Sequence, residues 1–173
     1  MSSRAGEPFD PVRAADEVAA LAAGPLPASG PAVAGGDPAT GEWTGTGGEG
    51  FRFVPLWEGD ALTGAYGGAW TDAVDAAGRC LDALVAELDA RWGPHARVPL
   101  HTALFARTAG RPLPPLLDAL LAQDCDGDLS VWGPLPGTGR RAAVSLAQHD
   151  GDAPPLLVAV AVDGAVEAVP EEG

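Results

Sequence analysis

The stretch TDAVDAAGRCLDALVAELDARW, residues 71–92, is the longest regular segment of the chain and decides its fold class. Its apolar residues recur every three or four positions, which is the spacing of a helix with one buried face. Thr71 suits the N-cap position, and Gly93-Pro94 ends the pattern. The stretch therefore predicts an amphipathic helix that lies on a sheet.

Segments of alternating or continuous apolar residues flank this helix on both sides and predict the strands. They are the ranges 51–57, 97–107, 128–133, 141–148 and 155–162, with a further short strand at 165–169. A second helix, opened by prolines, is predicted at 114–123. This order predicts an α+β domain with a mixed β-sheet, two helices packed on one face, and a C-terminal antiparallel meander.

The N-terminal part has a different composition. Residues 11–23 are predicted to form a short helix that follows an Asp-Pro start signal. Residues 24–50 are rich in Gly and Pro and poor in large apolar side chains, which is typical of a linker. We therefore expect a flexible, mostly disordered leader over residues 1–50, a single domain over 51–169 and a tail over 170–173.

The strand predicted at 155–162, PLLVAVAV, is apolar on both of its faces. A strand of this kind is usually covered on both sides. Two interpretations remain open: the second face is buried by the leader helix or a loop, or it is a partner surface, for which a homodimer is one form.

Three residue types are missing: the chain has no Lys, no Ile and no Asn. All three have AT-rich codons, so the composition indicates a GC-rich bacterial genome. The absence of Lys excludes a G-x-x-x-x-G-K-[ST] phosphate loop and a Schiff-base lysine. The absence of Asn excludes an N-glycosylation acceptor.

The formal net charge is −14. Nucleic-acid affinity comes mainly from Lys and Arg that neutralise phosphates, and anionic membranes repel acidic chains, so we expect neither partner. Residues 1–10 lack the apolar core of a secretory signal, and Cys80 and Cys125 are typical of reduced core thiols. The sequence therefore predicts a cytoplasmic protein.

The stretch Asp124-Cys-Asp126-Gly-Asp128 resembles the first half of an EF-hand calcium loop. Its carboxylates occupy positions 1, 3 and 5. Leu129 stands where that loop requires Gly, and Leu135 stands where it requires a bidentate Glu. The alternatives are a weak calcium-binding module and a polar turn between a helix and a strand.

No motif for nucleophilic catalysis and no cofactor motif is visible, and a protein that is not an enzyme is favoured. The alternative is a small enzyme whose site is assembled in space around His101, His149 and nearby carboxylates. Trp57 and Trp132 are candidate partner contacts, because tryptophan is enriched in binding hot spots, although core filling is its commoner role. The leading hypothesis is an interaction or regulatory protein that docks on another protein.

Overall fold

The computed structural model describes residues 8–59, 68–147 and 154–170. Within these residues it has four helices and a seven-stranded sheet, which confirms the α+β class. The helices are α1 (Pro11–Ala23), α2 (Gly68–Trp92), α3 (His101–Thr108) and α4 (Pro115–Ala122). The strands are β1 (Val33–Gly36), β2 (Trp43–Gly48), β3 (Phe51–Glu58), β4 (Ala96–Val98), β5 (Leu129–Trp132), β6 (Arg141–Ala147) and β7 (Leu156–Val162).

The strands follow the order β1-β2-β3-β7-β6-β5-β4, and each neighbouring pair is antiparallel. The expectation of a mixed sheet is therefore wrong. It assumed that α2 returns the chain to a strand beside β3, as in a parallel crossover. Instead, α2 carries the chain to β4 at the far edge, and β7 takes the place beside β3.

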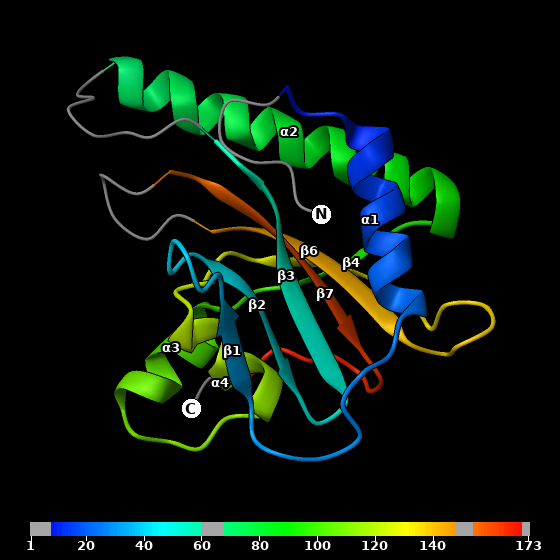
Figure 1. Cartoon of the computed structure of the whole chain (residues 1–173), viewed down its shortest axis with the longest axis vertical. Coiled ribbons are helices and arrows are strands. Elements are labelled where there is room, and N and C mark those ends of the chain that lie inside the picture. Colours follow the sequence, from blue (N-terminus) through cyan, green and yellow to red (C-terminus); the bar gives the residue numbers. More distant parts are fainter. Residues whose placement is uncertain (1–7, 60–67, 148–153, 171–173) are drawn as a thin grey trace.

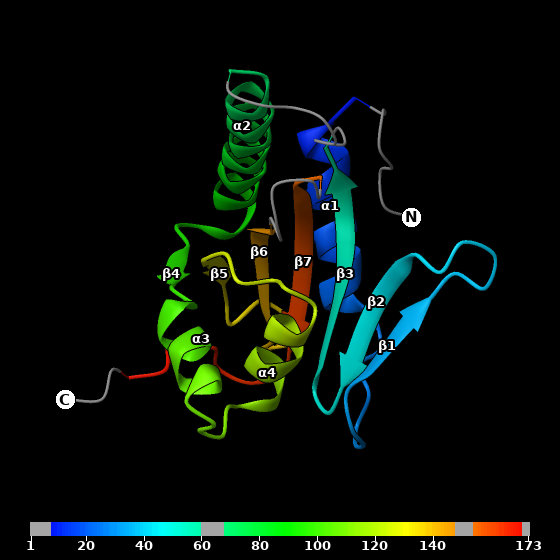
Figure 2. The same ribbon diagram turned by 90° about the vertical axis from the view of Figure 1, so that its left-hand side faces the viewer.

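Helices cover both faces of the sheet (Figure 1, Figure 2). One face carries α1 and α2, and the other carries α3 and α4. The prediction of two helices on one face is wrong for two reasons. It assigned α1 to a separate leader, and it assigned the residues of α3 to a strand.

Strand β7 lies at the centre of the sheet and is buried on both faces. Leu157, Ala159 and Ala161 pack on the side of α1 and α2, and Val158 and Val160 pack on the side of α3 and α4. Of the two interpretations for this strand, burial by the chain's own helix is confirmed. The alternating side chains of a strand explain why two layers are needed to cover it.

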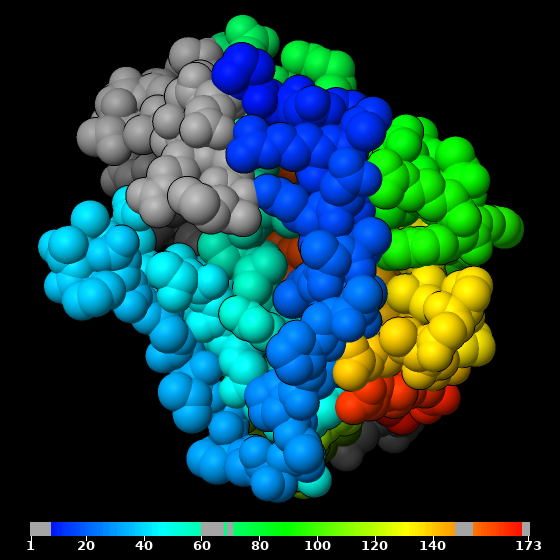
Figure 3. Space-filling model, turned by 45° about the vertical axis from the view of Figure 1, so that its right-hand side comes forward, coloured from blue at the N-terminus to red at the C-terminus, as the bar shows by residue number. Residues whose placement is uncertain are grey.

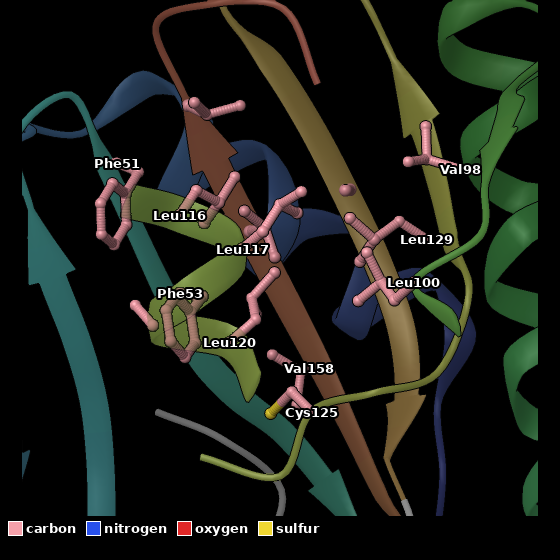
Figure 4. Packing of buried hydrophobic residues seen from close by; sticks show 14 of the residues in the cluster. Phe51, Phe53, Val98, Leu100, Leu116, Leu117, Leu120, Cys125, Leu129 and Val158 are labelled. Atoms are coloured by element: carbon pink, nitrogen blue, oxygen red, sulfur yellow. The ribbon is translucent and has the colours of Figure 1, made fainter. Parts of the chain in front are cut away.

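The core between the sheet and α4 is built from aromatic and aliphatic side chains (Figure 4). Phe51 and Phe53 project from β3 with their ring centroids 6.2 Å apart. Leu117 and Leu120 of α4 belong to the same cluster and are almost fully buried. This layer fixes α4, and therefore α3, against the sheet.

The structure corrects the prediction that residues 24–50 are a linker, because β1 and β2 belong to the sheet. Trp43 of β2 packs on Phe53 with ring centroids 5.6 Å apart, and its Nε1 donates to Thr46 Oγ1 at 2.9 Å. The Gly-rich composition obscured these strands, since hydrogen bonds between strands are made by the backbone and need few large side chains.

Two further strand predictions are wrong. The range 97–107 divides into the last two residues of β4 and most of the helix α3, because Pro99 lacks the N–H that would extend the strand. The range 165–169 is not a strand. Its Val166 and Val169 pack instead against the core on the α4 side.

Candidate functional site

The Asp124–Asp128 loop connects α4 to β5 and is fixed from two neighbouring strands. Arg97 of β4 donates to Asp128 Oδ2 through Nε at 2.9 Å and through Nη2 at 2.7 Å. Ser145 of β6 lies with its Oγ 2.9 Å from the Gly127 carbonyl oxygen and 3.0 Å from that of Asp128. The residue with a positive φ in this turn is Asp124, at 57°.

These contacts do not gather a calcium ligand set. Asp128 already binds a guanidinium, and across the described residues no group of three His, Cys, Asp or Glu side chains is placed to hold a metal ion. The arrangement is that of a helix-to-strand turn. The calcium hypothesis for Asp124, Asp126 and Asp128 gains no support from it.

The two tryptophans predicted as partner contacts lie in the layer between the sheet and α1–α2. Trp132 is 1% exposed, so its ring fills the core and does not fit the prediction of a partner contact. Trp57 is half-buried and makes an edge contact with Phe9, with ring centroids 5.6 Å apart. Its exposed part stays a candidate contact.

A cluster that sequence reasoning missed joins Trp132, Asp89 and His95. The indole Nε1 of Trp132 donates to Asp89 Oδ1 at 2.9 Å, and His95 Nδ1 lies 3.0 Å from the same oxygen. Because an ionised carboxylate only accepts hydrogen bonds, His95 Nδ1 is the donor. The His95 ring also lies 5.6 Å from the Trp132 ring. No spacing in the sequence indicates this contact, which depends on strand order.

A histidine oriented by a carboxylate is one part of many general-base sites. Here the pair serves a structural purpose, since the backbone N–H of His95 also donates to Asp89 Oδ1 at 3.1 Å and closes the turn after α2. Of the two histidines in the enzyme hypothesis, His101 is the exposed first residue of α3. His149 lies outside the described residues, so that hypothesis stays a prediction.

Helix α3 has an inverted amphipathic pattern. It buries Thr102, Ala103 and Ala106, which are small or polar. It exposes two large apolar side chains: Leu104 is 39% exposed and Phe105 is 68% exposed. A helix that packs on a core normally does the reverse.

Four exposed residues of α3 form one row, here called the outer stripe. It consists of His101, Leu104, Phe105 and Thr108, which are three or four positions apart and therefore share one side of the helix. Exposing Phe105 forgoes part of the roughly 1.5–3 kcal/mol that burial of a large apolar side chain contributes. The sequence signal for this stripe is the pair Leu104-Phe105 between Ala103 and Ala106, which places large and small apolar residues on different sides of a helix.

The segment around α3 also differs in charge from the remainder of the chain. Residues 90–117 contain four of the ten arginines and no Asp or Glu, although the whole chain carries 24 acidic residues. The segment therefore has a formal charge of +4, and the remainder has −18, which together give −14. Arg107, on α3, donates through Nε to Asp118 of α4 at 3.3 Å. The outer stripe thus belongs to a segment of the chain without acidic residues.

Comparison with known proteins adds no functional information: no family model, curated protein or solved structure matches this chain. In the part of the chain that the structure describes, no helix has the length and apolar character needed to cross a membrane.

Proposed function

We propose that this protein is a non-enzymatic interaction or regulatory protein of the bacterial cytoplasm and that the outer stripe of α3 docks on another protein. The observation that carries the proposal is the exposure of Phe105 and Leu104 on a helix whose buried face is small and polar. Aromatic anchors of this kind dominate binding energies when a partner encloses them.

The partner has a definite chemistry. It presents an apolar pocket for Phe105, and carboxylates around this pocket form ion pairs with the arginines near α3. Arg97 is 74% exposed and Arg107 is 45% exposed, and each guanidinium has more N–H donors than its single carboxylate partner uses. A symmetric contact between two α3 helices is disfavoured, because it places the arginines of both copies together.

The test is a capture experiment with the tagged full-length chain in its native host, followed by reconstitution. Phe105→Asp and Leu104→Asp place a charge in the outer stripe. The matched control is Val12→Asp, which adds the same charge to another exposed apolar residue, 50% exposed, in the first turn of α1. Thermal unfolding of each variant establishes that it is folded.

The proposal predicts one stoichiometric partner that Val12→Asp retains and both α3 variants lose. The purified partner should then bind the purified wild type and Val12→Asp with similar affinity. Its affinity for Phe105→Asp should be at least tenfold weaker, which corresponds to about 1.4 kcal/mol of binding free energy. A partner that all three variants retain would show that docking occurs elsewhere. Absence of a stoichiometric partner in repeated captures would refute the interaction hypothesis.

A further inference from the structure

A groove separates α1 from β3 on the face opposite α3 and α4. Its volume is about 320 Å³. The lining residues come from the second half of α1, from the segment that follows it and from β3. They are Glu17, Ala20, Leu21, Gly24, Pro25, Arg52, Val54, Pro55 and Leu56. Figure 3 shows the surface hollowed where α1 passes β3.

The groove has one cationic residue, Arg52, on strand β3 near the centre of the sheet. Its register partners are Gly47 on β2, over which Pro27 packs, and Ala161 on β7, and neither of the two has a polar side chain. Arg91, Arg97, Arg107 and Arg140 each pair with a carboxylate. Among the described residues, no hydrogen bond or ion pair engages the Arg52 guanidinium.

The apolar part of the groove extends away from Arg52 along β3. Val54 and Leu56 lie on the same side of the strand as Arg52, because side chains alternate, and Ala20 and Leu21 of α1 face them across the groove. From Arg52 to Leu56 the strand covers about 13 Å at roughly 3.3 Å per residue. This length suits a short hydrocarbon chain.

The acidic residue of the groove, Glu17, belongs to the end away from Arg52. In Figure 1, α1 and β3 run in opposite directions, so the start of β3 lies beside the end of α1 and Glu17 lies toward Leu56. A ligand with one carboxylate at Arg52 places only hydrocarbon along the apolar walls, whereas a second carboxylate at the other end would lose water there.

From these observations we infer that the groove binds a linear aliphatic monocarboxylate, with its carboxylate on Arg52 and its hydrocarbon chain along Val54, Leu56 and Leu21. A guanidinium binds a carboxylate through two parallel N–H bonds, which fixes the orientation of the ligand. The apolar walls supply the remaining affinity through removal of hydrocarbon from water. This site lies on the opposite face of the sheet from the outer stripe of α3 and is independent of it.

The experiment is isothermal titration calorimetry, which measures the Kd of the full-length protein for three probes of equal carbon number: octanoate, octan-1-ol and octanedioate. We expect octanoate to bind with a Kd in the micromolar to low millimolar range, and octan-1-ol and octanedioate to bind at least tenfold more weakly. Arg52→Gln should weaken octanoate binding at least tenfold, and Arg52→Lys should weaken it less. Arg79→Gln, at an exposed position on α2, is the matched control and should leave the Kd unchanged.

A second variant tests the groove without changing its charge. Ala20→Phe fills the space between α1 and β3, and it should abolish octanoate binding while thermal unfolding shows that the protein is folded. The inference is overturned if octanoate fails to bind up to 10 mM, if Arg52→Gln binds as well as the wild type, or if octan-1-ol equals octanoate.

Discussion

The indole N–H of Trp132 donates to the carboxylate of Asp89 at 2.9 Å, and this bond joins the end of β5 to the last turns of α2. The same carboxylate accepts the backbone N–H and the ring Nδ1 of His95. One acidic side chain therefore ties together α2, the turn that follows it and the strand β5. This relationship holds α2 on the sheet at the side where β4 begins.

Replacement of Asp89 by Ala should destabilise the protein by about 2 kcal/mol, because bonds to a charged acceptor are worth about 1.5–3 kcal/mol and Asp89 is partly exposed. Urea unfolding followed by tryptophan fluorescence measures the change. The control is Asp82→Ala, at an exposed position on the same helix, which should change the stability by less than about 0.5 kcal/mol. An equal decrease in the free energy of unfolding in the two variants would show that the hydrogen bond from Trp132 to Asp89 does not contribute to stability.

The contribution of Asp89 to the free energy of unfolding should depend on pH. Burial acts to raise the pKa of Asp89, but the hydrogen bonds from His95 and Trp132 outweigh it and hold the pKa below its ordinary value. A carboxyl whose pKa is lowered by folding stabilises the protein above its unfolded pKa, near about 4, and loses that effect as the pH falls through the folded pKa. The difference in unfolding free energy between wild type and Asp89→Ala should therefore be full at pH 7 and shrink below about pH 4. A difference that stays constant from pH 7 to pH 2.5 would contradict this assignment.

The sequence predicts those elements whose pattern is local. The 3.6-residue period of α2 and the continuous apolar run of β7 both lead to the correct element, because each has a buried face that its own residues specify. The strands β1 and β2 have almost no side-chain pattern, and their place depends on backbone pairing of β1 with β2 and of β2 with β3. Strand order is likewise set by contacts between distant segments, and for this reason the mixed sheet was the wrong expectation.

The candidate sites follow the same division. The outer stripe of α3 was within reach of the sequence, because Pro99 argues against a strand over 97–107, but the apolar residues of that range led to a strand prediction instead of a helix. The contact between Asp89 and Trp132 spans 43 positions and requires the three-dimensional fold. The groove beside Arg52 likewise requires the packing of α1 on the sheet.

The two cysteines should differ sharply in reactivity. Cys125 is 1% exposed, and burial together with the charges of Asp124 and Asp126 raises its pKa to about 12. Cys80 is half-buried; burial raises its pKa, and the neighbouring Arg79 partly opposes this. Since the thiolate is the reactive form, a disulfide reagent at pH 8 should label one thiol slowly in the folded protein and two after denaturation. In Cys80→Ser the folded protein should remain unlabelled, and rapid labelling of that variant would contradict the burial of Cys125.

Helix α3 also contains a buried hydroxyl whose removal should stabilise the protein. Thr102 is 8% exposed, and none of the residues that the structure describes makes a hydrogen bond with its Oγ1. A helical Thr usually bonds the carbonyl four residues earlier, but for Thr102 that residue is Val98, which belongs to β4. A buried hydroxyl without a partner costs about 1–3 kcal/mol, and Val has nearly the same shape as Thr.

We therefore expect Thr102→Val to raise the free energy of unfolding by about 1 kcal/mol. The matched control is Thr108→Val on the same helix, because Thr108 is exposed and its Oγ1 donates to the Leu104 carbonyl at 2.9 Å. The control should be neutral or slightly destabilising. Paired urea titrations measure both changes, and a Thr102→Val variant that is less stable than Thr108→Val would show that the hydroxyl is satisfied in solution. Because Thr102 faces the core, its substitution should also leave docking through the outer stripe unchanged, which separates the stability of α3 from its role as a binding surface.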